Sequence, residues 1–250
     1  GDRVFSFREL FQLFCIAYAF AISSNFIATI ITLITGDKTD VTSSVTDLVS
    51  GGGLAAAFIM IIVAPVVEEL IFRKFIIDRT KRFGEKYAII FSAVCFGLFH
   101  MNFQQFLYAA SIGLVFGYVY SRSGRIQYTM IMHSIINAIG YLIAMIAEPL
   151  LASLEDLDIL SMIETGNTGS FNIDYPSLFL VYRAEQAILA IIIMGIIFFI
   201  RKVRRVRFDY FSPDCLQKGR VFKTIYLNIG VILFAVICVA GMVISFLGIL

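Results

Sequence analysis

Charged residues are scarce in this sequence, at 15% of 250 residues, while hydrophobic residues make up 59%. A soluble domain needs a larger polar surface, so this composition excludes a soluble globule. Apolar runs recur along the whole length, which predicts one all-α integral membrane domain over residues 1–250 rather than a globule with an anchor. The formal net charge of +2 offers no basis for binding nucleic acid, and we expect no such partner.

Cysteine and histidine are also rare. The four cysteines form no CxxC pair: Cys15, Cys95 and Cys238 lie in apolar segments, and Cys215 lies in a basic loop. We therefore predict free thiols and neither a disulfide framework nor a zinc framework. Only two histidines are present, and the sequence contains no HExxH motif and no tandem repeat.

The long apolar runs predict seven transmembrane helices, and no cleavable signal peptide is expected because the first run is too long. The third and fourth predicted helices are short, so we expect a tight pair that does not fully cross the membrane. An eighth, interfacial helix is predicted in PLLASLEDLDILSMI, residues 149–163. The seven predicted helices span roughly residues 10–35, 54–78, 87–102, 104–121, 127–147, 177–200 and 222–250.

Basic and acidic loops alternate along the chain. This pattern predicts a multi-pass cell-membrane protein with its N-terminus in the cytoplasm and its C-terminus outside. Compact loops and the absence of an organellar targeting segment favour a bacterial plasma membrane. In the fourth predicted helix, Gly113 and Gly117 form a GxxxG motif, which is typical of close helix packing.

The stretch APVVEELIFRKF places two glutamates and an arginine in an apolar segment. Glu69 and Arg73 are four residues apart and are expected to form an ion pair on one helix face. Adjacent helical residues point about 100° apart, so we expect the two glutamates not to face one partner, which leaves Glu68 without a local counter-charge. Pro65 is expected to kink the helix and to admit water near Glu68. The alternative is that both glutamates only neutralise basic residues near a helix end.

Both histidines also lie in apolar helices, which makes them candidates for the same site. His133 and Asn137 are four residues apart and share a helix face, and Phe96 is expected to pack beside His100. Counted from the nearest basic residues, Glu68 and these polar groups fall about 12 to 21 Å from the cytoplasmic boundary. Three helices thus bring polar groups to one level, which indicates a single site.

These residue types suit the hydrolysis of an amide. A carboxylate beside an imidazole can take a proton from water, and a second imidazole with a carboxamide can stabilise an oxyanion. The same groups could instead bind a metal or relay protons in a transporter. The absence of a visible inverted repeat and the short chain argue against a transporter.

Together, the motifs EExxxR (Glu68, Glu69, Arg73), FxxxH (Phe96, His100) and HxxxN (His133, Asn137) resemble those of the CPBP or Abi family of intramembrane proteases. This family includes the endopeptidase that trims prenylated CaaX proteins and bacterial members linked to bacteriocin processing and immunity. The resemblance covers about residues 64–140. Eight spans are often described for the fold, so the N-terminal end is expected to be incomplete, or residues 148–176 to supply a re-entrant piece.

The resemblance implies a role for each motif residue. Glu68 would activate water, assisted by His100, while His133 and Asn137 would stabilise the oxyanion. Glu69, Arg73 and Phe96 would support them. No organic cofactor is implied, and metal dependence is left open: a bound metal such as zinc would use Glu68, His100 and His133.

The implied partners are a peptide or protein substrate reached from the membrane or the cytoplasm, and the lipid bilayer. The substrate could be a prenylated CaaX tail or a bacterial peptide precursor. The alternative function is a non-enzymatic immunity or regulatory protein that retains the fold and binds a membrane protein.

Overall fold

The computed structural model describes residues 3–35, 53–155, 175–204 and 222–247, together with residues 206, 208 and 220. Every regular element in this part of the chain is a helix, which confirms the predicted all-α class. Residues 149–155 continue a long helix, and the rest of the predicted eighth element lies outside the described residues.

The described helices follow the predicted apolar runs closely. One difference is the last predicted helix, which is divided because the Asn228 side chain accepts a hydrogen bond from the Val231 N–H and caps a new helix there. The helices are α1 (Phe7–Thr35), the continuous helix Gly53–Phe83, α5 (Glu85–Phe99), α6 (Phe103–Ser123), α7 (Ile126–Glu155), α9 (Tyr175–Val203), η4 (Phe222–Tyr226) and α11 (Ile229–Phe246). The continuous helix contains the segments η1 (Ile59–Val63), α3 (Ala64–Glu69), η2 (Leu70–Ile77), α4 (Asp78–Thr80) and η3 (Lys81–Phe83).

Five of the described helices are long and apolar enough to cross a membrane: α1, Gly53–Phe83, the Ile126–Ala147 part of α7, α9 and α11. The two remaining predicted spans, α5 and α6, are not among the five. With 15 residues, α5 is about 22 Å long, which is shorter than the hydrocarbon core of about 30 Å. The chain is a multi-pass membrane protein. The short α5 agrees with the prediction, whereas α6, with 21 residues and a length of about 31 Å, is not the short helix that the sequence predicts.

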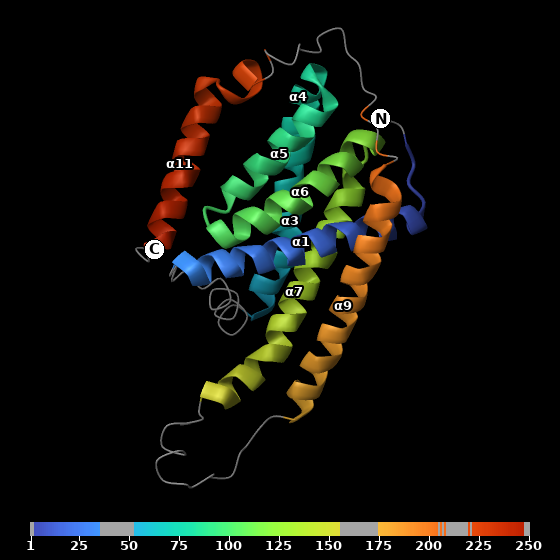
Figure 1. Cartoon of the computed structure of the whole chain (residues 1–250), viewed down its shortest axis with the longest axis vertical. Helices are drawn as coiled ribbons and strands as arrows, with labels where there is room; N and C mark the ends of the chain where they lie inside the picture. Colours follow the sequence, from blue (N-terminus) through green and yellow to red (C-terminus); the bar gives the residue numbers. More distant parts are fainter. Residues whose placement is uncertain are drawn as a thin grey trace.

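The helix α6 lies at the centre of the bundle, where it packs against α5 on one side and α1 on the other (Figure 1). One cluster of buried side chains joins α6 to α1 and α7, and includes Phe116, Ala17 and Met132. A second joins α6 to α5 and η2, and includes Phe96 and Phe72. Because both clusters share α6, this helix fixes the relative positions of α5, α7 and the Gly53–Phe83 helix.

Small residues allow α5 and α6 to approach closely as an antiparallel pair. A methyl group added at Gly113 would lie 2.9 Å from the Cα of Ala93, and one at Gly117 would lie 3.0 Å from the Ile89 side chain. These distances leave no room for a side chain at Gly113. The GxxxG prediction of close packing is therefore confirmed.

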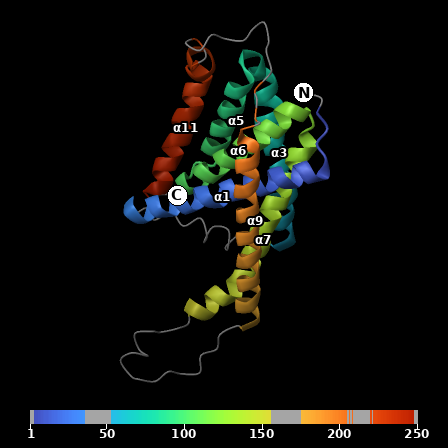
Figure 2. The ribbon, with the colours of Figure 1, turned by 45° about the vertical axis from the view of Figure 1, so that its right-hand side comes forward.

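The helices α9 and α11 lie at the periphery and expose most of their apolar side chains (Figures 1 and 2). Each is joined to the bundle through a glycine: Gly195 of α9 lies against the backbone of Cys15, and Gly241 of α11 lies against the side chain of Met101. Three of the predicted free thiols, Cys15, Cys95 and Cys238, are free and buried, and Cys215 lies outside the described residues.

Polar contacts gather where α5 begins and α6 ends. The buried Glu85 carboxylate accepts a hydrogen bond from the Ser121 hydroxyl at 2.8 Å and lies 3.4 Å from Nε of Arg122. The Lys81 ammonium donates to the Ser121 carbonyl at 2.5 Å. The alternation of basic and acidic loops predicts that this end faces the cytoplasm, and that orientation stays a prediction.

We expect Gly113→Ala to lower the free energy of unfolding by about 1–3 kcal/mol, because the added methyl group meets the Ala93 backbone. The matched control is Gly140→Ala in α7, where an added methyl group has no atom within 4 Å. That change is expected to be neutral or to stabilise by up to about 1 kcal/mol. Denaturant unfolding in detergent measures both, and equal effects would contradict the close approach of α5 and α6.

Candidate active site

The helix that carries both glutamates is not a regular α-helix. Wide turns of π-helix type occupy Ile59–Val63 and Leu70–Ile77, on either side of the α-helical segment Ala64–Glu69. The predicted perturbation at Pro65 thus takes the form of a wide turn that ends just before the proline. Insertions of this type often occur at functional sites, because they reorient side chains within a helix.

Glu69 and Arg73 form the predicted ion pair, with 3.0 Å between Oε2 and Nε, and both side chains are fully buried. One Arg73 amino group donates to the Ser92 hydroxyl at 3.1 Å, and this hydroxyl donates to the Phe72 carbonyl at 2.6 Å. The guanidinium also lies over the Phe96 ring, 4.8 Å from its centroid. Arg73 therefore connects the glutamate helix to α5.

His133 of α7 lies between the two glutamates. Its Nδ1 is 3.1 Å from Oε1 of Glu69, and its Nε2 is 3.6 Å from Oε2 of Glu68. The expectation that the two glutamates do not face one partner is therefore wrong. The physical reason is that each nitrogen of the ring meets one carboxylate, and the flexible glutamate side chains bring the two groups together although their Cβ atoms diverge.

The two glutamates differ in their access to the exterior. The Glu69 side chain is fully enclosed and already binds Arg73 and His133, whereas the Glu68 side chain is 17% exposed. Among the described residues, Glu68 makes no side-chain hydrogen bond, and its 3.6 Å contact with His133 is longer than one. Glu68 is thus the carboxylate that an incoming molecule can reach.

His100 follows the last residue of α5, and its ring contacts the same Phe96 ring as His133 does. Its Nδ1 is 2.9 Å from the Phe96 carbonyl, which can only accept, so Nδ1 carries the proton and Nε2 is left with a lone pair when the ring is neutral. The Phe96 ring centroid is 5.1 Å from that of His100 and 5.6 Å from that of His133. This confirms the predicted packing of Phe96 beside His100.

The contact between Glu68 and an imidazole is made by His133 and not by His100. In the described part of the chain His100 makes no hydrogen bond to Glu68, so the predicted assistance of Glu68 by His100 stays a prediction. Asn137 lies one turn beyond His133 and donates through Nδ2 to the Met60 carbonyl at 2.9 Å. This bond ties α7 to the first wide turn.

Three residues near the site were not found from the sequence. The Tyr108 ring of α6 lies 6.3 Å from the His100 ring. Ser92 holds Arg73, and Thr129 lies beside Glu69. A tyrosine, a serine or a threonine in an apolar helix resembles a packing residue, and no spacing marks it as part of a site.

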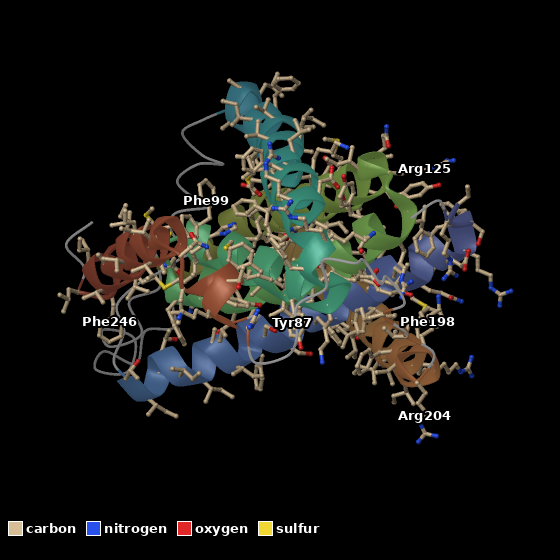
Figure 3. All side chains as sticks on the ribbon, turned by 90° about the horizontal axis from the view of Figure 1, so that it is seen from above. Tyr87, Phe99, Arg125, Phe198, Arg204 and Phe246 are labelled. Carbon is tan, nitrogen blue, oxygen red and sulfur yellow. The ribbon has the colours of Figure 1, made fainter. Side chains whose placement is uncertain are left out.

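The predicted convergence is therefore seen in the structure. The Gly53–Phe83 helix supplies Glu68, α5 supplies His100, and α7 supplies His133. Seen from above, Phe99 of α5 lies on the side of α11, and Arg125 lies on the opposite side (Figure 3). Among the described residues, no three histidine, cysteine, aspartate or glutamate side chains are arranged to hold a metal ion.

The fold and the site define a polytopic helical membrane protein with a glutamate–histidine cluster in its interior. A family model described as "Type II CAAX prenyl endopeptidase Rce1-like" matches residues 50–139, which contain all three motifs. The family resemblance predicted from those motifs is thereby confirmed.

Two curated proteins are similar to this chain. The "Putative membrane peptidase YdiL" of Bacillus subtilis (strain 168) is 29% identical over 124 residues, which cover 48% of this chain and 48% of the relative. The "UPF0177 protein YxdF" of Lactococcus lactis subsp. lactis (strain IL1403) is 29% identical over 141 residues, or 53% of this chain and 76% of the relative. The chain thus spans about half the length of the first relative. No solved structure matches the chain significantly.

Arg73→Ala is expected to lower the free energy of unfolding by about 3–5 kcal/mol, because it leaves the Glu69 carboxylate buried without a cation. The same helix offers a matched control in Lys74, whose pair with Asp78 has the same spacing and the same 3.0 Å separation but is exposed. Lys74→Ala should cost at most about 1 kcal/mol. Unfolding in detergent compares the two, and equal losses would contradict the structural role of the buried pair.

Proposed function

We propose that this protein is an intramembrane endopeptidase in which Glu68 activates the water that hydrolyses a peptide bond. The observation that carries the proposal is the pair of glutamates around His133, in which one carboxylate is enclosed and neutralised and the other is reachable. A site built only for stability would enclose both. The match of residues 50–139 to the Rce1-like family supports the same reaction.

In the proposed reaction, Glu68 takes a proton from water as the water oxygen attacks the carbonyl carbon of the substrate. The tetrahedral intermediate collapses when the C–N bond breaks, and the proton held by Glu68 passes to the leaving amine. The lone pair on Nε2 of His100 can orient the water or share its proton, which gives this residue the assisting role. Tyr108 is assigned to the same substrate site, because its ring lies 6.3 Å from that of His100.

The oxyanion of the intermediate is assigned to His133 and Asn137. The Asn137 Nδ2 carries two hydrogens, and one of them is used by the Met60 carbonyl, so the second can be given to the oxyanion. Glu69 and Arg73 hold His133 in place, and the Phe96 ring packs against both imidazoles. Preorganised donors of this kind are typically worth about 10²–10³ in rate each.

No step is assigned to a metal ion. A metal site uses at least three protein ligands at fixed distances, and the described His, Cys, Asp and Glu side chains do not form such a group. The Phe96 ring packs against both imidazoles, with its centroid 5.1 Å from that of His100 and 5.6 Å from that of His133. The proposal is a glutamate-type hydrolase, and chelation tests it.

The proposed substrate is a peptide or protein segment that reaches Glu68 from the membrane or from its cytoplasmic face. Prenylated CaaX tails and bacterial peptide precursors are the two classes to assay. The alternative, a non-enzymatic immunity or regulatory partner, requires no reachable carboxylate and is separated from the protease by the variant described next.

Glu68→Gln is expected to lower kcat for peptide cleavage by about 10²–10⁴-fold, because the amide keeps the shape of the side chain but cannot accept the proton. Cleavage is measured with purified protein in detergent or liposomes, and the melting temperature is measured in parallel. The control is Glu185→Gln on the exposed part of α9, which should leave kcat unchanged. Full activity of Glu68→Gln would refute the assigned role, and a function that persists without cleavage would favour the non-enzymatic alternative.

Addition of a strong chelator is expected to leave the cleavage rate of the wild-type protein unchanged. The reason is that the proposed base, Glu68, acts on water directly. Loss of cleavage on chelation, with recovery on addition of Zn²⁺, would show that the reaction is metal-assisted and would overturn this part of the proposal.

A further inference from the structure

The first wide turn leaves one backbone carbonyl without a partner in its own helix. The Ala64 N–H donates to the Ile59 carbonyl, five residues back, as in a π-helix. In this register the next N–H, that of residue 65, would donate to the Met60 carbonyl. Residue 65 is proline and has no N–H.

The partner of this carbonyl comes from another helix. Asn137 of α7 donates from Nδ2 to the Met60 oxygen at 2.9 Å. A carbonyl without a partner is costly in the apolar part of a membrane, where water cannot replace the missing donor. The wide turn, the proline and the asparagine thus belong together. The turn directs the Met60 carbonyl toward residue 65, the proline there has no N–H, and Asn137 supplies the missing donor.

We propose that Asn137 is a positioning residue that fixes the register of the glutamate helix by supplying the hydrogen bond that Pro65 cannot supply. The bond lies two turns before Glu68 on the same helix, and Pro65 lies three residues before it. If the bond is lost, the helix can recover a partner for the Met60 carbonyl only by changing the hydrogen-bond register of the wide turn. Such a change rotates Glu68 and Glu69 relative to His133.

The bond also sets the position of α7. Asn137 and His133 lie on one face of α7, and both contact the Gly53–Phe83 helix, His133 after Pro65 and Asn137 before it. Two anchors on either side of the proline hold the two helices in one alignment. The 3.6 Å separation between Nε2 of His133 and Glu68 depends on that alignment.

A double-mutant cycle between residues 65 and 137 tests the proposal. In Pro65→Ala the backbone gains the missing N–H, so a backbone donor is available to the Met60 carbonyl whether the turn stays wide or becomes α-helical. Asn137→Ala should lower the melting temperature of the wild-type protein by about 4 °C or more, and that of Pro65→Ala by less than half as much. Equal lowering in both backgrounds would overturn the proposal.

Asn228 supplies the matched control. Its Nδ2 also donates to a backbone carbonyl, that of Ile225, at 3.0 Å, but it lies at the start of α11. Asn228→Ala should lower the melting temperature by the same amount with proline or with alanine at residue 65. If both asparagines couple equally to residue 65, the coupling is unspecific and the proposal is wrong.

A second arm measures peptide cleavage, and this arm rests on the proposed function. Asn137→Ala should lose cleavage. The double variant with Pro65→Ala should cleave at least tenfold faster than Asn137→Ala alone, because the loss of Asn137 removes the helix register and not only an oxyanion donor. An unchanged rate in the double variant would overturn the positioning role. If the wild-type protein cleaves no peptide, the proposed function fails, while the melting-temperature cycle still decides whether Asn137 replaces the missing N–H.

Discussion

The constraint on which the rest of the structure depends is the cost of holding charge in an apolar interior. Glu69 and Arg73 are both fully buried, and neither is tolerable without the other. Each is also bound by a second helix, because His133 of α7 contacts Glu69 and Ser92 of α5 contacts Arg73. The ion pair therefore determines which helices must surround the Gly53–Phe83 helix, and on which sides.

The position of Glu68 follows from that enclosure. Once its neighbour is neutralised and fixed, Glu68 lies at the edge of the polar cluster with a partly exposed side chain and one imidazole nearby. Two adjacent residues of one type thus have different burial and different contacts because of their surroundings alone. The enclosed glutamate contacts the histidine, and in the proposed function the reachable glutamate exchanges a proton with water.

Much of this arrangement could be predicted from the sequence, because the relevant signals are local. Apolar runs locate the helices, and a spacing of four residues pairs Glu69 with Arg73. Contacts between helices are not encoded in any such spacing. The position of His133 between both glutamates depends on how α6 packs against α1 and α7, and that depends on shape complementarity between side chains that look alike in sequence. The wide turns could not be predicted from the sequence either, because Pro65 indicates that the helix is perturbed but not that the perturbation is a wide turn.

Met101 follows His100 directly and adopts a left-handed backbone conformation, with a φ of 50°, that few residues other than glycine adopt. Its side chain fills the space that the missing side chain of Gly241 leaves on α11. The turn that follows α5 and the helix α11 therefore pack closely against one another. Residues of α11 are consequently neighbours of the turn that carries His100, so sequence variation in α11 acts on the centre of the molecule as well as on its margin.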